Sequence, residues 1–131
     1  MKRTTSIATI ILLLLLSSAA TIWGQQVTKR LQFPRGRTTA VVTGRTNAHG
    51  GVVYLLRARK GQHMTVHVTS PKKDVSFQIS PVYSEEENPD PLEGAVKATD
   101  WEGDLPDTSE YSILVSTDTG TDTYTLEVTI R

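Results

Sequence analysis

Apolar and polar residues alternate along two stretches near the C-terminal end of the chain. The apolar positions are Tyr111, Ile113 and Val115 in the first stretch, and Tyr124, Leu126, Val128 and Ile130 in the second. A period of two is typical of half-buried antiparallel strands. The pattern predicts two strands joined by a polar link over residues 116–123.

A second pair of alternating segments covers residues 52–59 and 62–69, with Lys60 and Gly61 between them. The apolar members are Tyr54, Leu56, Ala58, Met64, Val66 and Val68. Each segment can turn one apolar face inward, and the short Gly-containing link favours a turn. We interpret these segments as a β-hairpin.

The rest of the chain adds shorter strands and loops. Strands are predicted over residues 38–44 and 75–79, with a loop over 45–51. Residues 81–108 contain four prolines and many acids, which favours a loop with a weak strand near 92–98. About seven to nine short strands are expected, so the predicted fold is all-β: a single antiparallel β-sandwich of jelly-roll or Greek-key type.

The first 24 residues have the pattern of a secretory signal peptide. Lys2 and Arg3 precede an apolar stretch over 7–16, and small residues follow, with cleavage possible after Ala20 or Gly24. Ten helical residues cover about 15 Å, too little for a hydrocarbon core of roughly 30 Å. No cysteine follows to carry a lipid, so we expect a periplasmic or secreted protein without a stable membrane anchor.

The remaining chain is long enough for one domain with one core. Residues 25–37 are expected to form a lead-in arm or edge strand, and residues 38–131 the sandwich. The protein has no cysteine, so apolar packing and sheet hydrogen bonds must stabilise it. Residues 25–73 hold ten Lys and Arg but no acid, whereas all 14 acids follow; if the halves interleave as strands, opposite charges become neighbours.

Metal chemistry is weakly supported. His63 and His67 are four residues apart, which on a strand separates them by about 13 Å, so we expect two surface histidines. The loop acids Asp100, Glu102, Asp104 and Asp107 are oxygen ligands at close spacing, but they lack the EF-hand order. A solvated acidic loop is the favoured interpretation, and a weak calcium site is left open.

Catalysis and nucleic-acid binding are not expected. The acids lie in an exposed loop without an apolar pocket to raise the pKa of one of them, and the chain has no Gly-x-Ser-x-Gly motif. The basic half offers no helix for a groove and no cluster of exposed aromatic residues. We therefore predict a non-enzymatic protein without a cofactor.

Two patterns resemble a known family. They are W-x-G-x-L-P-x-x-x-x-Y-x-I-x-V over residues 101–115, followed by Y-T-L-x-V over 124–128, and Y-x-L-x-A-x-x-G-Q-x-x-x-V over 54–66. Both resemble bacterial pre-peptidase C-terminal domains, especially the small stand-alone members similar to periplasmic inhibitors of g-type or i-type lysozyme. The resemblance covers about residues 38–131 and implies a binding module.

The resemblance also implies a site. In those inhibitors a Ser-Gly followed closely by Tyr lies on a loop that enters the lysozyme cleft, where hydroxyls contact the catalytic carboxylates. Thr108 and Ser109 stand at that place in this chain, without the glycine, and Glu110 adds a negative charge. The candidate partner-binding residues are Trp101, Asp104, Thr108, Ser109, Glu110 and Tyr111, although Trp101 and Tyr111 also fit core positions.

The function that follows is inhibition of a lysozyme-type muramidase by loop insertion. The expected partner is that muramidase, or another cell-envelope protein or glycan, and the expected state is a monomer or weak homodimer. The alternative is an accessory or adhesion module that binds polysaccharide or a partner protein through a sheet face, as in domains appended to secreted hydrolases.

Overall fold

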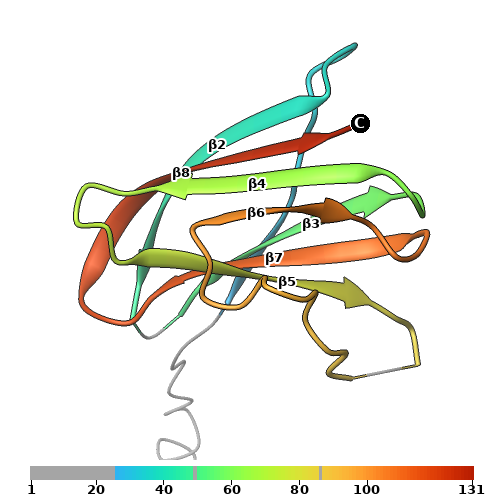
Figure 1. The fold of residues 1–131 in the computed structure, drawn as a ribbon. Coiled ribbons are helices and arrows are strands. Elements are labelled where there is room, and N and C mark those ends of the chain that lie inside the picture. The colour runs from blue at the N-terminus through green and yellow to red at the C-terminus, as the bar shows by residue number, and fades with distance from the viewer. Residues whose placement is uncertain (1–25, 49, 86) are drawn as a thin grey trace, which may run out of the picture.

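The computed structural model describes residues 26–48, 50–85 and 87–131, and the expected signal peptide lies outside them. The described residues form eight strands: β1 (Val27–Arg30), β2 (Thr39–Asn47), β3 (Val52–Ala58), β4 (His63–Thr69), β5 (Val75–Val82), β6 (Asp100–Asp104), β7 (Ser109–Thr117) and β8 (Thr121–Ile130). They make two packed sheets (Figure 1). The all-β sandwich expected from the periodicity is confirmed.

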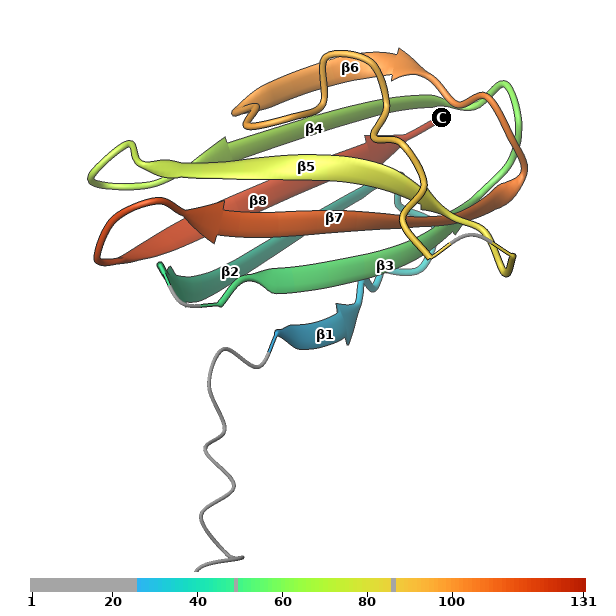
Figure 2. The ribbon, with the colours of Figure 1, turned by 90° about the horizontal axis from the view of Figure 1, so that it is seen from below.

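Each sheet has four strands. The first sheet has the order β1-β3-β7-β5 and the second has the order β2-β8-β4-β6. All neighbours are antiparallel except β1 and β3, which are parallel. Figure 2 shows the first sheet from outside, with the short β1 at its edge.

Every connection along the chain passes from one sheet to the other, as the two strand orders show. The predicted hairpin over residues 52–69 is therefore wrong: β3 lies in the first sheet and β4 in the second. A period of two reveals which side chains face the core, but it does not reveal which strands pair. The turn at Gly61, where φ is 86°, bridges the two layers instead.

The core lies between the sheets and is filled by the alternating apolar positions. The fully buried side chains include Leu56, Phe77, Ile79, Tyr111, Ile113 and Leu126. Two tyrosines meet inside it, with the Tyr54 and Tyr124 hydroxyl oxygens 2.6 Å apart and the rings edge to face. Burial, and next the hydrogen bond with Tyr54, raises the pKa of Tyr124.

Strand β6 corrects the sequence-based interpretation of the acidic segment. A strand was expected near residues 92–98, but that stretch forms turns and a single bridge from Ala98 to Phe77, and the strand follows it. The alternation in β6 is hidden because Gly103 occupies an inward position. The ring of Trp101 lies over that glycine, where an added Cβ would be 2.8 Å from Cζ2.

Two loops are shorter than expected. Strand β2 continues through Asn47 into the predicted loop over 45–51, and the link between β7 and β8 shrinks from residues 116–123 to 118–120. Polar residues form these added strand ends: Thr46, Thr117 and Asp122 are buried there. Apolar periodicity cannot detect strand residues whose inward side chains are polar.

Candidate functional site

The turn before β7 is held from inside the core. The hydroxyl of Tyr111 donates to the backbone oxygen of Asp107 at 2.6 Å and accepts from the backbone nitrogen of Asp107 at 3.2 Å. Tyr111 has no exposed surface, and burial raises the pKa of its hydroxyl. Among the predicted contact residues, Tyr111 therefore orders the turn and presents nothing to a partner.

The hydroxyls of Thr108 and Ser109 join the turn to neighbouring segments. Thr108 Oγ1 accepts from the backbone nitrogen of Lys60 at 2.9 Å. Ser109 Oγ lies 3.1 Å from both the Val82 and Glu110 carbonyl oxygens, so its proton is used within the protein. Both oxygens retain acceptor capacity for a partner, since a hydroxyl has two lone pairs.

A groove of about 810 Å³ opens beside these hydroxyls. It lies between the ends of β3, β5 and β7, and its lining includes Arg57, Val82, Tyr83, Glu85, Thr108, Ser109 and Glu110. The hydroxyl of Tyr83 donates to Asp107 Oδ2 at 2.6 Å, which ties the loop after β5 to the turn before β7. We call this feature the β7 groove.

The charges in the β7 groove differ from those that the sequence suggested. Glu110 forms an ion pair with Arg30 of the edge strand β1, so its negative charge is compensated. Arg57 is exposed, and its side chain has no hydrogen bond or ion pair to any described residue. As far as the described residues show, the groove thus presents an unpaired guanidinium beside two hydroxyls.

Sequence analysis missed Arg57 and Tyr83 as site residues. Arg57 is opposite Glu110 in the β3–β7 ladder, and Tyr83 follows β5, which pairs with the other edge of β7. Arg57 is 53 positions from Glu110 along the chain, and Tyr83 is 24 positions from Asp107. The alternation of apolar and polar residues indicated that Arg57 points outward, but it did not indicate the strand pairing that brings Arg57 to the groove.

The other two candidates, Trp101 and Asp104, lie on β6 in the second sheet and do not line the β7 groove. Trp101 packs against the core, and its Nε1 donates to the Glu93 oxygen at 2.9 Å. Asp104 faces outward. The six predicted contact residues therefore divide among the groove, the core and the second sheet.

The outer face of β4 and β6 carries alternating His and acidic residues. His63 Nδ1 is 2.9 Å from Asp104 Oδ1, its Nε2 is 3.1 Å from Glu102 Oε1, and His67 contacts Asp100. The hydrogen bond with Asp104 raises the pKa of His63, and the nearby Glu102 raises it further. Desolvation acts in the opposite direction but is outweighed. No group of three or more such residues within the described ranges is placed to hold a metal ion.

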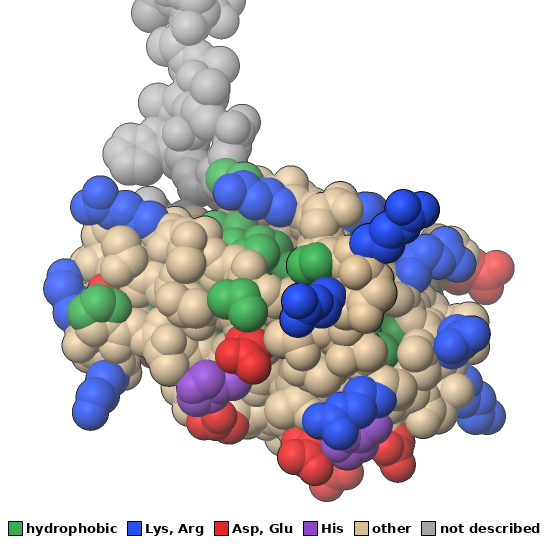
Figure 3. All heavy atoms as spheres, turned by 90° about the horizontal axis from the view of Figure 1, so that it is seen from above, with side chains coloured by type: hydrophobic (Ala, Val, Ile, Leu, Met, Phe, Trp, Pro, Cys, Tyr) green, Lys and Arg blue, Asp and Glu red, His purple; other side chains and the backbone are tan. Residues whose placement is uncertain are grey.

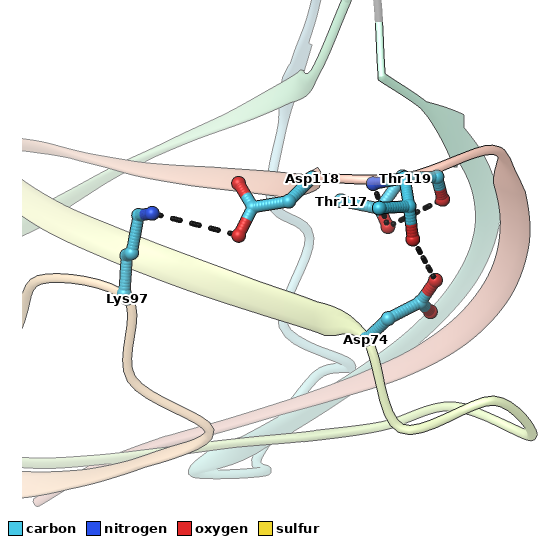
Figure 4. A network of polar contacts seen from close by, with 5 residues as sticks. All are labelled: Asp74, Lys97, Thr117, Asp118 and Thr119. Atoms are coloured by element: carbon cyan, nitrogen blue, oxygen red, sulfur yellow. Dashed lines mark hydrogen bonds and ion pairs between the residues drawn. The ribbon is translucent and has the colours of Figure 1, made fainter.

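Polar contacts also order the opposite end of the sandwich, where β7 turns into β8. Thr117 Oγ1 donates to the Thr119 oxygen at 3.1 Å, and Thr119 Oγ1 donates to Asp74 Oδ2 at 3.3 Å (Figure 4). Lys97 and Asp118 form an exposed ion pair nearby. These contacts hold the turn against the start of β5.

Among solved structures, several chains share this sandwich. Aeromonas hydrophila PliG, a periplasmic lysozyme inhibitor of g-type lysozyme, aligns with a TM-score of 0.66 and 23% identity, over 82% of this chain and 99% of that one. Salmonella Typhimurium PliG aligns with a TM-score of 0.56 and 20% identity, over 80% and 98%. The pre-peptidase C-terminal domain of Bacillus anthracis collagenase aligns with a TM-score of 0.53 and 12% identity, over 82% of this chain and 96% of that one.

These TM-scores establish a shared fold, and the resemblance read from the sequence is confirmed at that level. No protein-family model matches the chain, and no curated protein matches it. Over the described residues, no helix is long and apolar enough to span a membrane.

Proposed function

We propose that this protein is an exported, non-catalytic inhibitor of a lysozyme-type muramidase. The observation that carries the proposal is the extent of the structural match, which covers 99% of a g-type lysozyme inhibitor rather than one part of a larger protein. An inhibitor of that kind acts in the periplasm, which agrees with the signal peptide expected at residues 1–24.

The β7 groove is the contact surface in this proposal. A muramidase cleft carries acidic catalytic groups. Arg57 supplies a planar cation that pairs with a carboxylate through two hydrogen bonds, while the Thr108 and Ser109 oxygens accept hydrogen bonds from the partner. Arg30 removes the repulsion that an unpaired Glu110 would cause.

Rigidity of the turn supports the same role. A binding loop that is already ordered loses less conformational freedom on association. The two hydrogen bonds of Tyr111 fix Asp107, and the hydroxyl of Tyr83 fixes its carboxylate. Steric occlusion of the cleft then needs no cofactor and no chemical step.

The test is a cell-wall lysis assay with chicken-type, goose-type and invertebrate-type lysozymes. The chain lacking residues 1–24, which retains all eight strands, is added at increasing concentration. Inhibition of the goose-type enzyme is expected, because the structural neighbours are inhibitors of g-type lysozyme. Absence of inhibition of every class at micromolar excess would contradict the proposal.

A further inference from the structure

A second groove lies on the outer face of the second sheet, at the end away from the β7 groove. Its volume is about 800 Å³, and its lining includes Thr43, Arg45, Thr69, Ser70, Pro71 and Thr125. Strand β4 begins three residues after Lys60, which contacts Thr108 of the β7 groove, and ends at Thr69 in this second groove; its seven residues span roughly 20 Å. We call this feature the threonine groove.

Three threonines from three strands form one row across its floor. Thr43 of β2 is opposite Thr125 of β8, and Thr125 is opposite Thr69 of β4. Their chain neighbours Gly44, Val68, Tyr124 and Leu126 face the core, so the three threonine side chains face outward. Neighbouring strands lie about 4.8 Å apart, which sets the spacing of the hydroxyls.

The hydroxyls of this row are unused within the described protein. Thr43, Thr69 and Thr125 make no side-chain hydrogen bond to any described residue. Thr39 and Thr129 lie on the same face, four residues along β2 and β8 from Thr43 and Thr125. Their hydroxyl oxygens are 2.9 Å apart and form a hydrogen bond with each other. The open row therefore offers donors and acceptors to a ligand that the closed pair does not.

One cation in the threonine groove lacks a partner. Arg45 is exposed, faces outward beside Thr123, and has no ion pair among the described residues. Lys72 at the rim instead donates from Nζ to the Thr121 oxygen at 2.8 Å.

The acids around this groove do not neutralise Arg45. Asp122 is buried and accepts from the backbone nitrogens of Lys72 and Thr123. Glu127 lies in the next row, opposite Val41 and His67. Figure 3, which looks onto this face, shows mostly uncharged polar side chains and backbone, with Lys and Arg largely at the margins, a few hydrophobic side chains, and acidic and His side chains grouped on one side.

We propose that the threonine groove binds an acidic glycan, with sugar hydroxyls on the threonine row and a sugar carboxylate on Arg45. Hydroxyl donors and acceptors in a row match the polyhydroxyl edge of a sugar, and the guanidinium fork matches one carboxylate bidentately. Arg45 is the one cation among the described lining residues, which suits a ligand that carries one carboxylate on each sugar. The threonine groove does not overlap the β7 groove, so one molecule of this protein can bind a glycan and a muramidase at the same time.

The test is a titration of the chain lacking residues 1–24 with trigalacturonate, followed by amide NMR and calorimetry. Maltotriose serves as the neutral trisaccharide and sodium acetate as the bare carboxylate. Trigalacturonate is expected to shift the amides of Thr43, Arg45, Thr69 and Thr125. Neither control ligand is expected to shift them comparably at the same concentration.

Substitutions separate the two parts of the site. Arg45→Gln should weaken trigalacturonate binding at least about tenfold, as expected for loss of a charge-assisted hydrogen bond. Thr125→Val should weaken it without a change in charge, and Arg59→Gln, outside both groove linings, should leave it unchanged.

The proposal is overturned if trigalacturonate does not bind at millimolar concentration, if acetate or maltotriose binds equally well, or if Arg45→Gln has no effect. Lysozyme inhibition by Arg45→Gln is expected to equal that of the parent chain. Failure of this proposal therefore stays distinguishable from failure of the inhibitor function.

Discussion

The hydroxyl of Tyr111 and the backbone of Asp107 form a reciprocal pair of hydrogen bonds, 2.6 Å to the carbonyl oxygen and 3.2 Å from the nitrogen. The tyrosine belongs to the core of the first sheet, and the aspartate to the turn that borders the β7 groove. The groove is thus shaped by a core residue that no partner can reach. Fold stability and the geometry of the proposed contact surface are coupled at this point.

Replacing Tyr111 with Phe removes both of these hydrogen bonds. Because two backbone groups of Asp107 lose their partner, we expect the free energy of unfolding to fall by about 1–3 kcal/mol, measured by urea denaturation. Tyr83→Phe is the comparison, since its hydroxyl bonds the exposed Asp107 carboxylate, and we expect a smaller loss. Equal losses for the two variants would mean that Tyr111 does not hold the turn.

Arg57→Ala should abolish most inhibition of the goose-type lysozyme without changing stability. The guanidinium has no partner within the described protein, so its removal leaves no unpaired group behind. The matched control is Arg59→Ala, which removes an exposed arginine two residues further on that does not line the β7 groove. Lysis assays in which both variants inhibit equally would refute the role of Arg57.

Gly44→Ala should destabilise the sandwich through Tyr124. A Cβ at this position would lie 2.4 Å from the Tyr124 hydroxyl oxygen and 2.7 Å from Cζ, so the ring must move away from Tyr54. We expect a loss of about 1–3 kcal/mol in thermal or urea unfolding, as for other overpacked cores.

A double-mutant cycle tests whether that loss acts through the tyrosine pair. In a Tyr124→Phe background the closest clash is absent, so Gly44→Ala should cost less there than in the parent chain. An equal cost in both backgrounds would place the origin of the loss elsewhere.

The contacts of β6 with β4 should depend on pH. The hydrogen bond with Asp104 and the nearby Glu102 raise the pKa of His63 above its ordinary value of 6.5. The folded state therefore binds the proton more tightly than the unfolded state, so the stabilising contribution is full below pH 6.5 and disappears as the pH rises through the folded-state pKa. Histidine NMR titration should give a pKa above 6.5 that falls in Asp104→Asn; an unchanged value in that variant would contradict the assignment.

The sequence was sufficient to predict which side chains of each strand face the core, but it was not sufficient to predict which strands pair. Tyr54, Met64, Ile113 and Leu126 are all buried as their alternation predicted. The same alternation suggested a hairpin over residues 52–69, because a short link between two amphipathic strands looks alike whether it joins neighbours in a sheet or crosses between layers. Only tertiary packing distinguishes the two arrangements.

The site was predictable in part for the same reason. Thr108, Ser109 and Glu110 line one groove together because they are consecutive in the sequence. Arg57 and Tyr83 reach the same groove through the β3–β7 and β5–β7 ladders, whose register a single sequence does not contain. β6 was missed because its inward positions hold Trp101 and Gly103, one covering the other, so no apolar alternation remains to be seen.

Inhibition by this protein requires contact between a muramidase and the β7 groove. Hydrogen exchange of the chain, free and mixed with a goose-type lysozyme, measures that contact residue by residue. We expect added protection over residues 82–85 and 107–110 together, with the threonine groove unchanged. Absence of a complex at micromolar concentration, or protection confined to the outer face of the second sheet, would contradict binding through the β7 groove.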